Sequence, residues 1–217
     1  MTDNSIDDLI NEIKAQREIM FTQAKNVIGG SLLRDDFYFL SLVDRCIRLS
    51  DGFVEMISSR NIMCLGILLR CLLDNIMRLF AYFIAEDRDE LVQIFLKDEK
   101  KIDTLKDRKG KRMFDWYLKE ELRILDNRFV GVYNAASGYV HHSGKSLFSI
   151  ADALEDYRIE MVIGGEIPQR NNIHLQECAK AFMHYLLLQQ DLVDRIILAK
   201  MEFDRNKEDN DVVLAHK

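Results

Sequence analysis

Apolar side chains recur at helical spacing along nearly the whole chain. At the start, Ile6, Leu9, Ile10 and Ile13 fall on one face at intervals of three and four residues, as in an amphipathic helix. The same spacing, with candidate capping residues, predicts helices at about 5–27, 36–60, 61–85, 88–97, 112–124, 127–141 and 172–203. The predicted fold class is therefore all-α, a helical bundle with a long C-terminal helix.

One stretch before the last helix departs from this spacing. Residues 157–163 alternate briefly between polar and apolar side chains and lead into Gly164-Gly165 and the only proline, Pro168. This alternation favours a short strand or hairpin near 157–163. The residues after 204 are mostly polar, so we expect a single helical domain over 1–204 and a flexible C-terminal tail over 205–217.

The segment 62–85 is apolar around nearly its whole circumference. Such a helix either lies at the centre of a bundle or spans a membrane. Arg70, Asp74 and Arg78 interrupt the segment near its middle, and three charges there would be costly in lipid. We therefore predict a central, buried helix over about 61–85 and no membrane span.

The charges in this helix form a stripe. Gly66, Arg70, Asp74 and Arg78 recur every four residues and share one face. A buried arginine needs acceptors because its guanidinium stays charged, and Asp74 is one turn away from both arginines. Two interpretations follow: a pocket for a phosphate or carboxylate, lined by these charged residues, or a structural ion network that joins this helix to its neighbours.

A second polar face lies within 127–141. Small and polar residues recur there at spacings of three and four: Asn127, Gly131, Asn134, Gly138 and His141. His141 and His142 come where Ser143-Gly144 should end the helix, and the helix dipole favours a protonated histidine at that position. One interpretation has either histidine facing the arginine stripe as a proton donor or phosphate ligand, with Asn134 beside it. The other is a helix cap whose histidine bonds to backbone carbonyls.

Composition and charge narrow the function classes. The formal net charge is −6, so the surface as a whole is not one that attracts nucleic acid. The four cysteines show neither CxxC spacing nor a Cys/His cluster, and no GxGxxG or Walker loop occurs, so we expect no metal and no cofactor. The acidic N-terminus lacks the layout of a signal peptide, and we expect a reduced, cytoplasmic location.

One basic run, 97–112, is followed by Phe114, Trp116 and Tyr117. Basic and aromatic side chains in alternation can follow a single nucleic-acid strand by charge and stacking. The run also contains four acidic residues, so its excess charge is modest and a solvated loop between two helices is the alternative. The last helix is apolar on more than one face, which predicts either a homodimer or a purely intrachain role in the core.

Two segments carry a resemblance to a known group of proteins. Asn61–Asp74 (N-I-M-C-L-G-I-L-L-R-C-L-L-D) and the later Y-N-A-A-S-G-Y-V-H-H-S resemble uncharacterised bacterial HEPN-like helical proteins, including abortive-infection-type families. The resemblance covers about residues 35–200. It implies an all-helical bundle, often dimeric and sometimes tied to RNA cleavage, nucleotide binding or phage defence. In it Arg70 and Asp74 match the arginine–acid pair, and His141 matches the later histidine.

The sequence departs from the catalytic members of that group, in which four to six residues separate an arginine from a histidine. Here Arg170 precedes His174 by three intervening residues, and Arg128 precedes His141 by twelve. We therefore expect first a non-catalytic binding or regulatory module whose internal Arg/Asp/His site holds a nucleotide, an RNA phosphate or another anion, with RNA, a nucleotide or a protein as partner. The alternative is a metal-independent ribonuclease of a bacterial defence or toxin–antitoxin system, using His141 and Arg70.

Overall fold

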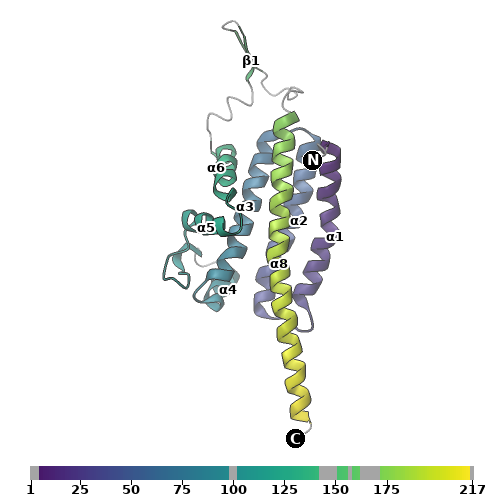
Figure 1. Ribbon diagram of the computed structural model, residues 1–217, viewed down its shortest axis with the longest axis vertical. Coiled ribbons are helices and arrows are strands. Elements are labelled where there is room, and N and C mark those ends of the chain that lie inside the picture. The colour runs from purple at the N-terminus through teal and green to yellow at the C-terminus, as the bar shows by residue number, and fades with distance from the viewer. Residues whose placement is uncertain (1–4, 98–101, 142–150, 156–157, 162–171, 216–217) are drawn as a thin grey trace.

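The computed structural model describes residues 5–97, 102–141, 151–155, 158–161 and 172–215, and the described chain is an all-α bundle (Figure 1). Its α-helices are α1 (Ile6–Ile28), α2 (Arg34–Ser58), α3 (Ile62–Ile84), α4 (Arg88–Lys97), α5 (Asp115–Glu121), α6 (Phe129–Val140) and α8 (Asn172–Ala215). Short 3-10 turns occur at Ile102–Thr104 and Leu122–Ile124. The predicted fold class is confirmed.

Local capping explains where the helices begin and end. The Ser5 hydroxyl accepts the Asp8 N–H at 3.2 Å, and Asp8 accepts the Ser5 N–H in return, which starts α1. Gly29, at a φ of 56°, ends the same helix in a conformation that favours glycine. Asn61 caps α3 by accepting the Cys64 N–H at 3.1 Å. These signals are local, which is why the sequence places these boundaries well.

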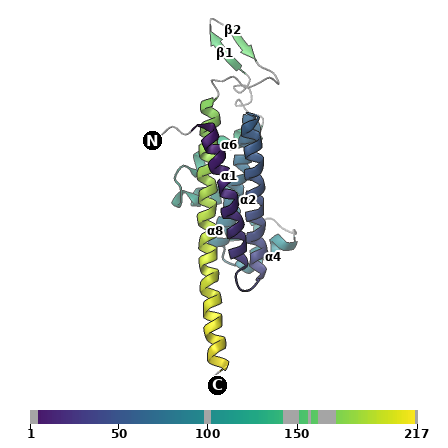
Figure 2. The same cartoon turned by 90° about the vertical axis from the view of Figure 1, so that its right-hand side faces the viewer.

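The long helices α1, α2, α3 and α8 run side by side, while α5 and α6 lie on the other side of α3 (Figures 1 and 2). Helix α3 touches α2, α8, α6 and α5, so it occupies the centre of the fold. Its fully buried side chains include Leu65, Leu72, Leu73 and Ile76. The predicted central helix is therefore confirmed.

A buried polar layer crosses the apolar core. The Asn75 side-chain amide donates to the Leu42 carbonyl at 2.8 Å and to Gln189 Oε1 at 3.0 Å, and Gln189 Nε2 donates to the same carbonyl at 3.2 Å. Gln23 Nε2 donates to the Gln190 carbonyl at 3.0 Å. These bonds join α1, α2, α3 and α8 in one register, because a sliding helix would leave buried polar groups unpaired.

Two further features bear on the predictions. A short antiparallel pair consists of β1 (Ala151–Glu155) and β2 (Arg158–Met161). Strand β2 falls within the predicted range 157–163, whereas β1 precedes that range. Helix α8 continues to Ala215, past residue 204 and beyond the end of the bundle (Figure 2). The backbone of 205–215 is thus helical, and the division into a domain and a flexible tail stays a prediction. Among the described residues, none of the helices combines the length and the hydropathy that a membrane span requires.

Candidate functional site

Arg70, the centre of the predicted stripe, joins α3 to α6. Its Nε donates to Ser137 Oγ at 3.0 Å, its Nη2 donates to the Tyr133 hydroxyl, and its Nη1 pairs with Asp74 one turn along α3. The guanidinium carbon also lies 3.7 Å from the centroid of the Tyr133 ring. With 15% of its side chain exposed, Arg70 has a protein partner at each guanidinium nitrogen.

The close approach of α6 to α3 depends on Gly66. A Cβ added at this position would lie 2.3 Å from ring atoms of Tyr139, well inside van der Waals contact. The small-residue position in the stripe therefore accommodates an aromatic ring from α6 rather than a ligand. Together with Arg70, it fixes how the two helices meet.

Arg78, the other arginine of the stripe, has a different partner from the one expected. Asp74 pairs with Arg70, whereas Arg78 Nη2 donates to Asp115 Oδ1 at 2.6 Å, at the start of α5. The stripe thus consists of two separate ion pairs, directed at two different helices. Each pair is neutral, so the local net charge of +1 that Arg70, Asp74 and Arg78 alone would give does not persist.

Asn134 and His141 share one face of α6, and their described contacts are with residues other than Arg70. Asn134 Oδ1 accepts the Lys119 ammonium at 2.9 Å and is exposed on the side of α5. His141 is the C-cap of α6; its N–H donates to the Ser137 carbonyl at 3.1 Å and its side chain is exposed. Among the described residues, no hydrogen bond or ion pair joins His141 to Arg70. His142 lies outside the described residues.

Two sequence features that looked separate meet in one pocket. Arg78 of the stripe and the aromatic residues after the basic run line a pocket of about 540 Å³, here named the aromatic pocket: Arg78, Ile102, Asp103, Phe114, Asp115 and Trp116. Trp116 is 63% exposed. Its ring is inclined 17° to that of Phe114, with the centroids 6.4 Å apart. The pocket therefore offers flat apolar surface beside charged groups.

A tight turn supports the pocket and contains part of the basic run. The buried carboxylate of Asp107 accepts the backbone N–H groups of Lys109 and Lys111 at 3.0 and 2.7 Å and the Tyr117 hydroxyl at 2.6 Å. Burial raises the pKa of Asp107, but these hydrogen bonds outweigh it and hold the pKa below its usual value. Residues 106–112 are thus an ordered turn built around one carboxylate.

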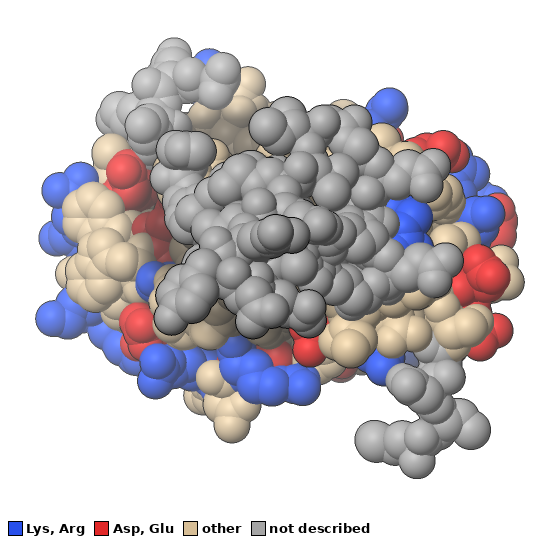
Figure 3. Space-filling view, turned by 90° about the horizontal axis from the view of Figure 1, so that it is seen from above, with Lys and Arg blue, Asp and Glu red and all other residues tan. Residues whose placement is uncertain are grey.

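The basic side chains of this turn are exposed: Lys106, Arg108, Lys109, Lys111 and Arg112. The guanidinium of Arg112 lies over Phe114, 4.8 Å from the ring centroid, which brings the turn to the edge of the aromatic pocket. From above, Lys and Arg gather along the lower left of the visible face, although the whole chain is acidic (Figure 3). A local basic patch thus exists despite the net charge of −6.

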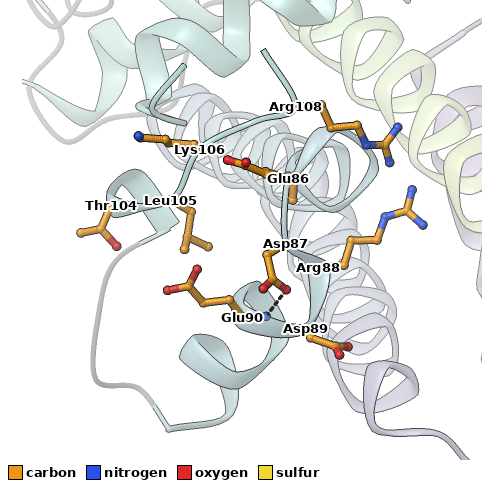
Figure 4. A pocket seen from close by; sticks show the side chains of 10 residues that line it. Glu86, Asp87, Arg88, Asp89, Glu90, Thr104, Leu105, Lys106 and Arg108 are labelled. Atoms are coloured by element: carbon orange, nitrogen blue, oxygen red, sulfur yellow. Dashed lines mark hydrogen bonds between the residues drawn. The ribbon is translucent and has the colours of Figure 1, made fainter. Parts of the chain in front are cut away.

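A roomier pocket, of about 840 Å³, lies where the same turn meets the start of α4 (Figure 4). Its wall alternates carboxylates such as Glu86 and Glu90 with basic groups such as Lys106 and Arg108. Figure 4 shows the Arg88 and Arg108 side chains pointing away from Glu90. The pocket has no single sign of charge and no aromatic wall, so it offers little selectivity for a ligand.

One further cluster, formed by the turn before α6 and by α8, does not follow from the sequence pattern. His184 Nε2 lies 2.8 Å from Asp126 Oδ2 and 3.0 Å from Arg128 Nη2, and Arg128 Nε donates to Asp126 Oδ1 at 3.2 Å. His184 stands 58 positions after Asp126, so no local pattern could have revealed the contact. We name these three residues the acid–histidine cluster.

The described residues contain no group of three or more His, Cys, Asp or Glu side chains that could hold a metal ion, and the four cysteines are free. Comparison with protein-family models, with curated proteins and with solved structures finds no match for the chain. The fold is therefore described as an all-helical bundle, and these comparisons give the HEPN-like assignment no support.

Proposed function

We propose that this chain is a helical binding module without chemistry of its own, which holds a nucleotide or single-stranded RNA at the aromatic pocket. The observation that carries the proposal is that Arg78 and the exposed Trp116 line the same pocket. Membership of the HEPN-like group belongs to this proposal, and it rests on the resemblance of Asn61–Asp74 and of the segment around His141.

Stacking and charge together favour such a ligand. Bases stack on exposed aromatic rings with a free energy of about 1–3 kcal/mol per base, whatever their sequence. A pocket of about 540 Å³ is large enough for one nucleoside. Of the exposed basic side chains of 106–112, Arg112 lies over Phe114, where it can attract the phosphate that follows the base.

The proposed ligand lies at one end of the stripe rather than along all of it. Arg70 and Asp74 are engaged with each other and with α6, so they position α3 rather than meet the ligand. Arg78 lies where the stripe opens into the aromatic pocket. Of the residues first expected to bind, Arg78 is the one retained as a ligand contact.

Trp116 is the only tryptophan of the chain, so its fluorescence reports directly on this pocket. Titration with mononucleotides and short oligoribonucleotides should quench it saturably, and the affinity for oligonucleotides should fall as salt rises. Phe114→Ala should weaken binding by about tenfold, because it removes one stacking surface. Arg123→Ala is the control, because Arg123 is paired with Glu120 outside the pocket. A folded protein whose fluorescence responds to no nucleotide would refute the proposal.

The acid–histidine cluster favours a second candidate, a metal-independent ribonuclease. Asp126 holds His184 through Nε2, which leaves Nδ1 to accept or donate a proton. Arg128 lies beside the ring and can neutralise a phosphate oxygen. In this candidate function the cluster takes the roles first expected of His141 and Arg70.

The two candidates differ in a simple assay. A ribonuclease of this kind should cleave RNA in the presence of EDTA, and His184→Ala should abolish that activity. His174→Ala is the matched control, because His174 is an exposed histidine of the same helix that pairs only with its neighbour Glu177 among the described contacts. Absence of cleavage by the wild type, or cleavage that persists in His184→Ala, would exclude this ribonuclease and leave the binding module as the candidate function.

A further inference from the structure

The aromatic pocket contains more carboxylates than cations. Asp103 and Asp115 both line it, against the single guanidinium of Arg78. That guanidinium already donates to Asp115 Oδ1 at 2.6 Å. A bare phosphate entering the pocket would meet an excess of negative charge, so the interior suits the N–H donors of a ligand better than its anionic part.

Asp103 is held in place beside the stacking surface. Its backbone carbonyl accepts Arg112 Nε at 3.2 Å, and the same guanidinium lies over Phe114. Within the described chain, no hydrogen bond or ion pair occupies the Asp103 carboxylate. As far as the described residues go, this partly buried carboxylate near the exposed Trp116 ring has two acceptor oxygens without a partner.

We propose that the occupant of the aromatic pocket is a guanine base, stacked on Trp116, with its N1–H and N2–H groups donating to the Asp103 carboxylate. This inference rests on the proposed binding function. Guanine presents two neighbouring N–H donors in one direction, which matches the two oxygens of a carboxylate. On the same edge, adenine and cytosine present a ring-nitrogen acceptor beside their amino group, and uracil flanks its single N–H with two carbonyl acceptors, so each would turn a lone pair toward the negative charge.

The phosphate of such a ligand lies outside the pocket. The exposed basic groups of 106–112 border the pocket at Arg112, so they are placed to attract a phosphate attached to a base within it. Carboxylates inside and cations outside thus select for a guanine nucleotide or a guanine in single-stranded RNA, rather than for inorganic phosphate.

The test compares GMP, IMP, AMP and UMP by the fluorescence of Trp116 in the wild-type protein. IMP differs from GMP by the lack of the 2-amino group, so GMP should bind about tenfold tighter than IMP if both N–H groups donate to a carboxylate. Asp103→Asn should remove this difference and leave AMP binding no weaker than before. Glu120→Gln, which removes the same charge outside the pocket from an exposed side chain of α5, should preserve the difference.

The outcomes separate the two proposals. Equal affinity for all four nucleotides would overturn the guanine assignment and leave the binding function standing. No response to any nucleotide would overturn both. Binding of an arginine-rich peptide that depends on Asp103, without nucleotide binding, would identify the pocket as a cation site and overturn both as well. The comparison of nucleotides on the wild type needs no variant, so it is decisive even if Asp103→Asn does not fold.

Discussion

At the scale of single residues, Asp126 is a carboxylate whose environment keeps it ionised. Only 8% of its side chain is exposed, and burial raises its pKa. Hydrogen bonds from the Arg128 backbone, from His184 and from the Arg128 side chain outweigh burial, and the pKa falls from 3.8 to about 2. The folded-state pKa thus lies below the unfolded one, so the charged carboxylate stabilises the fold above about pH 4 and loses this effect as the pH falls toward 2.

Asp126→Asn should therefore lower the free energy of unfolding by about 2 kcal/mol at pH 7, and by much less near pH 2. Urea denaturation of both proteins at the two pH values measures the difference. A loss of the same size at both pH values would mean that packing, and not the ionised carboxylate, is responsible.

Arg70 allows a second test at this scale. Arg70→Lys keeps the charge but removes the planar donors that meet Tyr133 and Ser137, so we expect a loss of about 2 kcal/mol in the free energy of unfolding. Nucleotide binding, read from Trp116, should be unaffected. If Arg70→Lys left the free energy of unfolding unchanged but weakened nucleotide binding, Arg70 would be a ligand contact, and its structural role would be contradicted.

The sequence predicts local residue pairs better than distant ones. Arg70 and Asp74 are one helical turn apart, so their ion pair follows from spacing alone. Asp115, which pairs with Arg78, lies 37 positions away, and Ser137 lies 67 positions from Arg70. Such partners depend on how the helices meet, which no short pattern contains.

At the scale of elements, the contact between α3 and α6 depends on the absence of a side chain at Gly66. Gly66→Ala should destabilise the protein by about 1–3 kcal/mol, because the new Cβ would overlap the Tyr139 ring, although alanine favours helices by up to about 1 kcal/mol. Gly131→Ala in α6 is the matched control: its Cβ would meet no atom within 4 Å, so it should be neutral or stabilising. Equal melting temperatures for the two variants would contradict this account.

Helix ends were predictable because the residues that cap a helix, like ion pairs within it, are close together in the sequence. Ser5 and Asn61 cap by bonding to backbone groups three positions away, which the sequence alone reveals. The turn at 106–112 was not, because it depends on the burial of Asp107 against Tyr117 and on pairing with the end of α3. The basic composition of this segment predicts a solvated loop, because the burial of the Asp107 carboxylate cannot be inferred from the sequence.

At the scale of the whole molecule, α8 has 44 residues and is about 66 Å long, so it reaches past the bundle (Figure 1). Where it still lies against the bundle, α8 carries exposed apolar residues, Leu198 at 61% and Met201 at 54%. We expect a homodimer that covers this surface. Sedimentation at micromolar concentration should give twice the monomer mass, and Leu198→Asp should reduce it. A wild type that sediments as a monomer would exclude the dimer.

The outline of the architecture was predictable because a helix that is buried on all sides has an almost wholly apolar composition. The segment 62–85 is apolar on all sides, and only a central position accommodates that in water. The placement of α5 beside α3, which creates the aromatic pocket, has no corresponding pattern in the composition of the chain. It depends on contacts between Arg78 and Asp115 that only the assembled chain makes.

The buried polar layer also affects the order in which the helices can align during synthesis. During synthesis α1, α2 and α3 emerge well before α8, yet Asn75 and the Leu42 carbonyl find their common partner, Gln189, only on α8. Until then the first three helices expose the apolar groove that α8 will cover, and the Gln23 side chain lacks the Gln190 carbonyl to which it donates. The first three helices can associate before α8 is synthesised, but their final alignment requires the contacts that α8 makes.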